Sequence, residues 1–185
     1  MRAPRKDVQR NRRRLVTAAR EVFTEQGPEV SLDEIARRAC VGPTTLYRHF
    51  ADKEELVAAV LDDLVAGVRE TADAAVDATD PLDAFRSMFV DSCDLSDAES
   101  ETFLRLAASS SRASAHAQRL ISELVEPVTT RLRECGGLHP GISADDIAML
   151  IRMTVAADDP AGRAKAVQVM LAGLTQVADT GSIGH

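Results

Sequence analysis

The sequence is poor in aromatic residues and in cysteine, and it has no long apolar run. Of its 185 residues none is Trp, one is Tyr, five are Phe and three are Cys. Three widely spaced cysteines (Cys40, Cys93 and Cys135) argue against a disulfide framework and against a zinc cluster, so we expect no metal. The longest stretch without a charged residue, 166–178, has 13 residues, fewer than the roughly 20 that cross a bilayer. These absences exclude a disulfide-rich secreted domain and a membrane-spanning helix.

Motifs typical of enzymes are also missing. The four histidines (His49, His116, His139 and His185) have no metal-ligand spacing. There is no HExxH, no P-loop and no nucleophile elbow. The N-terminus has no apolar stretch of the kind found in signal peptides. We therefore expect a cytoplasmic protein that is not an enzyme and uses no cofactor.

Charge is distributed unevenly along the chain. The net charge is −7. Residues 1–50 hold 11 Lys or Arg against 6 Asp or Glu, whereas residues 51–185 hold 11 against 23. Seven of the basic residues lie within the first 14 positions. A basic segment on an acidic body is typical of a protein that binds a polyanion with one end, although a solvated, disordered tail would look the same.

The spacing of apolar residues after this segment predicts three short elements. Apolar residues at i, i+4, i+7 and i+8 from Leu15 predict an amphipathic helix that ends at Gly27-Pro28. The S-x-x-E sequence 31–34 predicts a capping box at the start of a second helix, 32–39. Pro43 suits the first position of a third, 44–50. Two short helices joined by a tight turn, after a supporting helix, predict a helix-turn-helix.

The third of these helices has one polar and one apolar face. Leu46 and Phe50 are spaced to point inward, and the side chains between and before them are polar. Each polar residue taken alone could be structural: Tyr47 half-buried, His49 at the helix end, Lys53 solvated. Together, and behind a basic segment, hydroxyls, a phenol, a guanidinium and an imidazole favour contacts to phosphates and bases.

Residues 10–60 resemble the DNA-binding domain of TetR-type transcriptional regulators. The resemblance lies in AAREVFTEQG, VSLDEIARRACV and GPTTLYRHFADKEELVAAVL, and above all in the family pattern L-Y-x-H-F-x-x-K-x-x-L at 46–56. It implies that Tyr47, His49 and Lys53 hold phosphates and that Thr44, Thr45 and Arg48 face the groove. Ser31 would bind phosphate through the N-terminus of its helix. With the basic segment, the expected DNA contacts are Arg10, Arg12, Arg13, Arg14, Ser31, Pro43, Thr44, Thr45, Tyr47, Arg48, His49 and Lys53.

Two positions depart from the family pattern. Cys40 stands where the family has Gly, so it must accept a tight turn at some cost in backbone energy. Gly42 stands where the family has a hydroxyl residue, so the recognition helix lacks a side-chain cap.

The remainder of the chain is also predicted to be helical, with no strand-like alternation. A longer helix would run from Asp52 through Val68, and others would begin near residues 80, 97, 117, 143 and 160. The fold class is therefore all-α with about nine helices. We expect a basic arm and helix-turn-helix domain at 1–55 and a helical effector-binding and dimerisation domain at 56–185.

The second domain is expected to bind a small-molecule effector and to form the dimer. Soft or aromatic residues could line a pocket, although each could equally be core, and His116 could be a surface residue. The pocket candidates are Phe85, Met88, Phe89, Phe103, Leu106, His116, Met149 and Met153. By resemblance, the last two helices pair with those of a second copy. The interface candidates are Ile147, Leu150, Ile151, Val167, Met170, Leu171 and Leu174.

The sequence thus predicts a dimeric regulator, most consistent with a repressor that an effector releases from a palindromic operator. Two alternatives remain. The chain could be a helix-turn-helix adaptor controlled by a protein partner, which would have a filled second domain. It could also be an all-helical enzyme with a basic tail. The operator, the effector and the regulated genes are not encoded in any pattern we recognise.

Overall fold

The computed structural model describes residues 5–93, 97–156 and 159–175. This part of the chain forms ten helices, and extended pairing in it is confined to an isolated antiparallel bridge between Leu138 and Thr175. The all-α prediction is confirmed, with one helix more than expected. Contacts divide the chain into two compact units: Met1–Ala66 with Ser96–Arg119, and Gly67–Leu95 with Leu120–His185. This division differs from the boundary we expected at residue 55.

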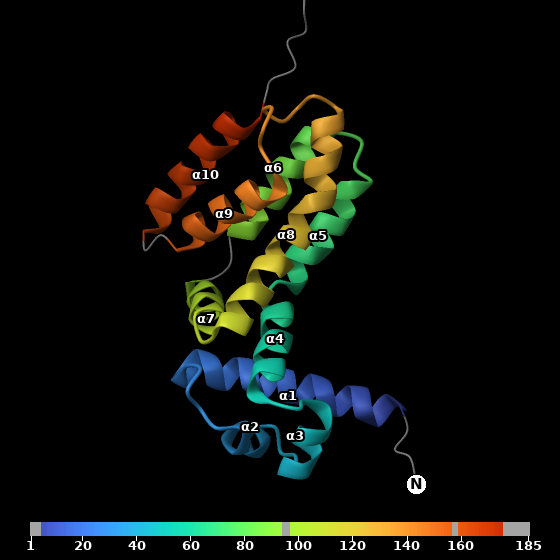
Figure 1. The fold of residues 1–185 in the computed structure, drawn as a ribbon, viewed down its shortest axis with the longest axis vertical. Helices are drawn as coiled ribbons and strands as arrows, with labels where there is room; N and C mark the ends of the chain where they lie inside the picture. Colours follow the sequence, from blue (N-terminus) through green and yellow to red (C-terminus); the bar gives the residue numbers. More distant parts are fainter. Residues whose placement is uncertain (1–4, 94–96, 157–158, 176–185) are drawn as a thin grey trace, which may run out of the picture. The chain divides into compact units, whose positions relative to one another are not determined.

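Unit 1 is built around α1 (Arg5–Gln26), which packs against α2 (Leu32–Arg38), α4 (Lys53–Leu64) and α7 (Asp97–Ala107) (Figure 1). α3 (Pro43–His49) packs against α2. The predicted apolar stripe of α1 forms the centre of the core, since Leu15, Ala19, Val22 and Phe23 are at most 1% exposed. α4 belongs to this unit because its apolar face closes the same core.

The basic segment is helical, contrary to the expectation of an arm before a helix that begins at Leu15. α1 begins at Arg5. Arginine is a good helix former, and Asp7 in the first turn pairs with Arg10, three residues along the helix, at 3.0 Å. The described arginines therefore occupy fixed places on one helix surface.

The helix predicted from Asp52 through Val68 is two helices, which accounts for the additional element. α4 ends at Leu64, and α5 (Ala66–Val76) begins after a single residue, Val65, whose backbone is not helical. Gly67 is the second residue of α5, and glycine is less favourable than alanine in a helix by about 1 kcal/mol. α8 (Ser111–Glu134) also begins earlier than the Ala117 we expected. Ser96, in the predicted capping box before α7, lies outside the described residues, as does the tail after Thr175.

Unit 2 contains α5, α6 (Pro81–Cys93), the second half of α8, α9 (Ala144–Val155) and α10 (Pro160–Leu174). Phe85, Met88 and Phe89 of α6 are fully buried, and the two phenyl rings lie 6.0 Å apart. α6, α9 and α10 pack against one another. α9 begins with the predicted cap, here a complete capping box between Ser143 and Asp146. A further tie is the bond from the His139 backbone N–H to the Leu174 carbonyl, 3.0 Å long.

Candidate nucleic-acid interface

α2 and α3 are joined by a tight turn that backbone hydrogen bonds close. Ala39 caps α2, and Cys40 follows with φ +53°. The Val41 N–H bonds the Ala36 carbonyl (3.0 Å) and the Cys40 N–H bonds that of Arg37 (3.1 Å). These two bonds are those of a Schellman motif, whose left-handed position is normally glycine. The predicted strain at Cys40 is confirmed, because a non-glycine residue occupies this conformation.

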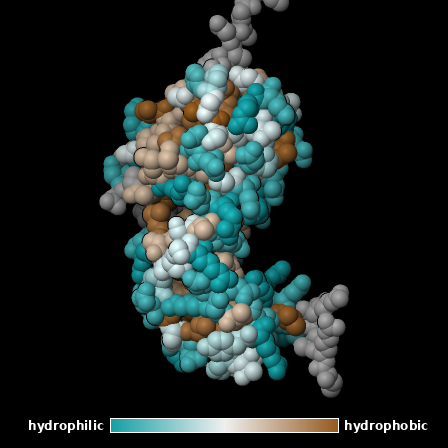
Figure 2. Space-filling view, in the orientation of Figure 1, coloured by the Kyte–Doolittle hydropathy of each residue, from teal (hydrophilic) through white to brown (hydrophobic). Residues whose placement is uncertain are grey.

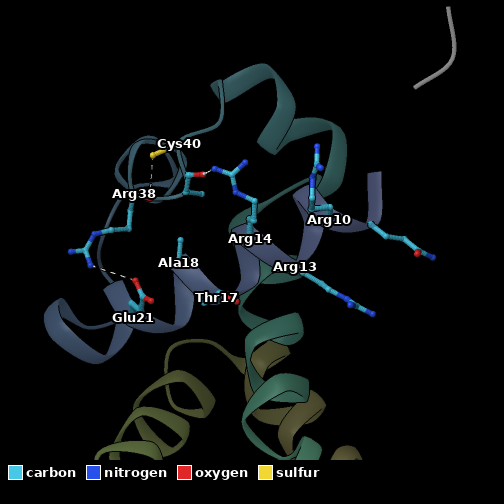
Figure 3. A pocket seen from close by; sticks show the side chains of 10 residues that line it. Arg10, Arg13, Arg14, Thr17, Ala18, Glu21, Arg38 and Cys40 are labelled. Atoms are coloured by element: carbon cyan, nitrogen blue, oxygen red, sulfur yellow. Dashed lines mark hydrogen bonds and ion pairs between the residues drawn. The ribbon is translucent and has the colours of Figure 1, made fainter. Parts of the chain in front are cut away.

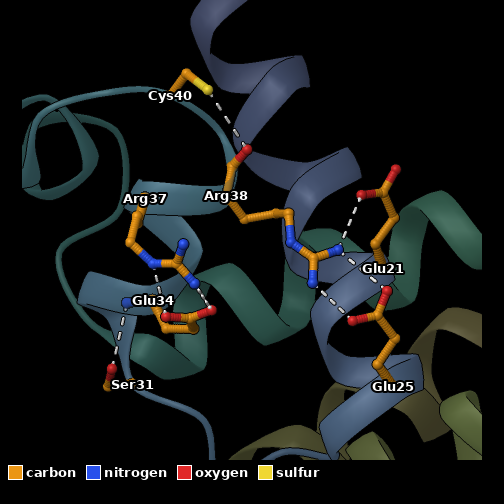
Figure 4. Close-up of polar contacts among 7 residues, drawn as sticks. All are labelled: Glu21, Glu25, Ser31, Glu34, Arg37, Arg38 and Cys40. Atoms are coloured by element: carbon orange, nitrogen blue, oxygen red, sulfur yellow. Dashed lines mark hydrogen bonds and ion pairs between the residues drawn. The ribbon is translucent and has the colours of Figure 1, made fainter.

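Both short helices begin as the sequence predicts, with one difference. Ser31 caps α2 by accepting a hydrogen bond from the Glu34 N–H at 3.3 Å. The predicted reciprocal bond is not made, because the Glu34 carboxylate accepts from Arg37 instead, with 3.0 Å between Nε and Oε2 (Figure 4). Gly42 caps α3 without a side-chain bond, and Pro43 is its first residue. The weak cap of the recognition helix is thus confirmed.

α3 separates its apolar and polar faces as expected. Leu46 and Phe50 are fully buried, whereas Thr44, Tyr47 and Arg48 are exposed, Tyr47 by 54%. Thr45, His49 and Lys53 are half-buried. None of these six polar side chains has a hydrogen-bond or ion-pair partner among the described residues. A helix that is anchored on its apolar face and has polar side chains without hydrogen-bond partners on the other can bind phosphates and base edges in a major groove.

The four arginines predicted for DNA contact have different surroundings. Arg10 pairs with Asp7, and both side chains are largely exposed. The Arg12 guanidinium lies over the Phe50 ring, 5.0 Å from its centroid. Arg14 donates to the Ala39 carbonyl at 2.9 Å. Arg13 is exposed and has no partner among the described side chains.

A cavity of about 500 Å³ lies between α1 and the turn (Figure 3). Arg10, Arg13 and Arg14 of α1 all line this cavity, and Arg14 reaches toward the turn. Arg38 also lines the cavity, and its guanidinium forms a bidentate ion pair with Glu25 (3.0 and 2.7 Å). This cavity is a recess in a basic surface rather than an enclosed pocket for a small molecule.

Two further arginines of the helix-turn-helix are engaged with acidic neighbours (Figure 4). Arg38 lowers the pKa of Glu25 by hydrogen bonding to its carboxylate, and Arg37 does the same to the pKa of Glu34. All four side chains therefore stay charged at neutral pH, and their charges cancel in pairs. Arg37 and Arg38 contribute less to a polyanion site than a count of basic residues suggests.

Unit 1 also contains ion pairs that the sequence analysis did not find. Arg112 of α8 contacts Asp52 (3.0 Å), the residue that caps α4, and Glu54 (3.2 Å). His116, expected in the effector pocket, contacts Asp62 with 3.1 Å between Nε2 and Oδ1. Arg20 pairs with Asp63 and Glu99. Sequence periodicity carries no signal for such pairs, because the partners lie on helices far apart in the chain.

The eight predicted pocket residues are divided between the two units. Phe85, Met88 and Phe89 are buried core of unit 2. Phe103 and Leu106 are buried in unit 1, which also holds His116. Met149 and Met153 are on α9 in unit 2 but are 44% and 59% exposed. The pocket stays a prediction.

The predicted interface residues on α9 and α10 differ in how far they are buried within the protomer. Ile147, Ile151 and Leu174 are buried within the protomer. Leu150, Val167, Met170 and Leu171 are only half-buried. Apolar side chains gather over α9 and α10 on the face that Figure 2 shows. The exposed large apolar residues of these two helices are Met149, Met153 and Val169.

Two other kinds of site are not found in the part of the chain that the structure describes. No cluster of three or more His, Cys, Asp or Glu side chains is arranged to hold a metal ion. No helix combines the length and the apolar character that a membrane crossing requires.

α2, the turn and α3, supported by α1, are a helix-turn-helix. Residues 15–60 match the family described as bacterial regulatory proteins, tetR family. Over nearly its whole length the chain is similar to the TetR transcription regulatory protein from Mycobacterium vanbaalenii. The TM-score is 0.63 at 27% identity, over 93% of this chain and 99% of that one. Residues 15–60 therefore carry the domain of the tetR family of bacterial regulatory proteins, and this segment lies in unit 1.

Relatives of known type match over shorter stretches. The HTH-type transcriptional activator FasR of Mycolicibacterium smegmatis is 42% identical over 85 residues, 43% of this chain and 39% of FasR. An HTH-type transcriptional regulator of Staphylococcus aureus is 45% identical over 53 residues, 28% of this chain and 29% of that protein. The chain therefore covers less than half the length of these two curated relatives.

Proposed function

We propose that this protein is a transcriptional regulator that binds a palindromic operator as a homodimer and acts most simply as a repressor. The observation that carries the proposal is the polar surface formed by exposed Tyr47 and Arg48 of α3 and half-buried Lys53 at the start of α4. These side chains have no hydrogen-bond or ion-pair partner among the described residues and lie beside a helical basic segment. By the family pattern, Thr44, Thr45 and Arg48 face the groove, while Tyr47, His49 and Lys53 hold phosphates. Such a regulator acts in the bacterial cytoplasm, where the DNA is.

Dimerisation through α9 and α10 is supported by the apolar side chains that these helices leave exposed. α10 has apolar residues around its whole circumference, and Val169 is 60% exposed in the protomer. Exposed apolar surface of this kind marks protein interfaces. A dimer also gives two reading heads, which a palindromic site requires.

Control by a small-molecule effector is the less supported part of the proposal. Unit 2 is a separate compact unit of the size and composition that could bind a ligand. Its predicted lining residues Phe85, Met88 and Phe89 are fully buried, however. That burial favours a second candidate function, a regulator whose unit 2 binds a protein partner instead of a small molecule. An effector must bind one state of the dimer more tightly than the other to change DNA affinity.

Selection of bound duplexes from a random pool tests the proposal directly. We expect an enriched motif with two-fold symmetry and half-sites about one helical turn apart. The complex is then challenged with a metabolite library to look for release. A pool without any enriched two-fold motif would overturn the DNA-binding part, and enrichment without release by any metabolite would favour control by a protein partner.

Direction of control needs a separate measurement, because the relative FasR is named an activator. A reporter placed behind the selected operator is expected to be silenced by the protein. Stimulation of the reporter would reverse the assignment as a repressor.

A further inference from the structure

Two arginines of α1 contact the C-terminal ends of the two short helices, α2 and α3. Arg12 lies over the ring of Phe50, 5.0 Å from its centroid, and Phe50 is the residue that caps the C-terminus of α3. Arg14 donates to the carbonyl of Ala39, the residue that caps the C-terminus of α2. Two residues apart on one helix, these arginines thus touch the last residue of each short helix.

α3 depends on such contacts for its orientation. It has seven residues, too few for an isolated helix to be stable. Its N-terminus has no side-chain cap, since Gly42 stands there. Leu46 and Phe50 anchor one face, and the Arg12 guanidinium packs over the buried Phe50 ring. A cation over an aromatic face and a charged donor at a helix C-terminus both stabilise the geometry in which they are made.

Arg13 and Arg10 have no comparable role. Arg13 is exposed and has no partner among the described residues. Arg10 pairs with Asp7, but both side chains are exposed, at 70% and 44%. Exposed ion pairs contribute little, so a phosphate can replace Asp7 at low cost.

We propose that Arg12 and Arg14 are positioning residues, which hold the recognition helix at the angle that reads bases, and that Arg13 and Arg10 supply the phosphate contacts of α1. This inference rests on the proposed DNA-binding function and divides the four arginines that the sequence treats as equivalent. A guanidinium held against the protein makes no direct phosphate contact, whereas an uncommitted one can contact a phosphate and release its counterions.

Salt dependence separates the two roles. The slope of log K against log[salt] for the selected operator is measured for the full-length protein and for Arg12→Ala, Arg13→Ala and Arg14→Ala. Arg13→Ala is the matched control, on the same turn and with the same change of charge. Each lost phosphate contact reduces the slope by about 0.9 per protomer. We expect that reduction for Arg13→Ala, and an unchanged slope for Arg12→Ala and Arg14→Ala.

Base discrimination gives a second readout, which loss of stability alone does not move. The ratio of affinities for the selected operator and for a site changed under α3 is measured where every variant is folded. We expect the ratio to fall about two- to fivefold in Arg12→Ala, the effect of one cation–π contact, and to stay unchanged in Arg13→Ala. Arg12→Lys keeps a cation over the ring and should restore most of the ratio.

A double-mutant cycle tests the contact itself. Phe50→Leu removes the ring and keeps an apolar side chain, so Arg12→Ala should cost much less discrimination in the Phe50→Leu background than in the wild type. Equal costs in both backgrounds would overturn the role of Arg12. Equal slope losses in all three alanine variants, with base discrimination intact, would overturn the division of roles.

Amide hydrogen exchange in the free protein keeps this inference separate from the proposed function. We expect faster exchange at Leu46 and Phe50 in Arg12→Ala and Arg14→Ala, and no change in Arg13→Ala. If the wild type selects no two-fold operator, the proposed function fails, whatever the exchange rates are. If it selects one and the exchange at α3 is the same in all variants, only the present inference fails.

Discussion

Replacing Cys40 with glycine should stabilise the protein, although it removes a side chain. Cys40 is the non-glycine residue with positive φ among the described residues, at +53°. A left-handed backbone costs an L-residue about 1–2 kcal/mol. Glycine removes that strain but increases the entropy of the unfolded chain, which costs about 0.4–1 kcal/mol. The side chain is exposed, and its thiol lies 3.9 Å from the Arg38 carbonyl, so little packing is lost.

The difference is a gain of up to about 1.6 kcal/mol with a midpoint of about 0.8 kcal/mol, and the midpoint corresponds to about 2–3 °C in melting temperature for a chain of this length. Urea denaturation followed by far-UV circular dichroism and by Tyr47 fluorescence would measure it, since Tyr47 is the sole tyrosine and lies in unit 1. Cys135→Gly is the matched control, an exposed cysteine without positive φ. It should destabilise by about 0.4–1 kcal/mol. Shifts of the same sign in both variants would refute the strain argument.

Four further variants test the site. Gly42→Ser should stabilise by about 0.5–1 kcal/mol in urea denaturation, because a Cβ there meets no atom within 4 Å, serine can cap α3, and the unfolded chain loses entropy; unchanged stability would mean that no cap forms. Arg48→Ala should relax base preference in the selected DNA pool, whereas Lys53→Ala should weaken all sites alike, and identical sequence profiles for both would contradict their different roles. The pKa of Asp52 is lowered by the Glu55 N–H and by Arg112, so its charged form adds stability that is present above the ordinary aspartate pKa and is lost as the pH falls through the lowered value. Asp52→Asn should therefore weaken the loss of stability on acidification below about pH 4, and an unaltered pH profile would show that this carboxylate is not coupled to folding.

The sequence predicts those features that depend on neighbours along the chain. The stripe from Leu15, the inward pair Leu46 and Phe50, and the cap at Ser143 are all local patterns, and each has the predicted place. The strain at Cys40 could also be foreseen, because the family pattern that the sequence resembles has glycine at this position.

Features that depend on competition between local bonds, or on distant partners, could not be foreseen. Glu34 binds Arg37 rather than its own cap, a competition between two local bonds of similar energy. Arg12 and Arg14 look like their neighbour Arg13 in the sequence, and the fold of α2 and α3 over α1 alone decides which of them finds a partner. His116 is drawn to Asp62 by the packing of unit 1, which no spacing reveals.

The charge available for DNA is smaller and more localised than the basic N-terminal half suggests. Most arginines of unit 1 have acidic or carbonyl partners within the unit: Arg10, Arg14, Arg20, Arg37, Arg38 and Arg112. Three expected DNA contacts, Arg13, Arg48 and Lys53, have none among the described residues. Because charges paired with carboxylates cancel at a distance while the others do not, the field toward DNA arises at α3, the start of α4 and the arginines of α1 that have no acidic partner. The net charge of −7 is then compatible with DNA binding, since an acidic remainder disfavours every orientation that does not present this surface.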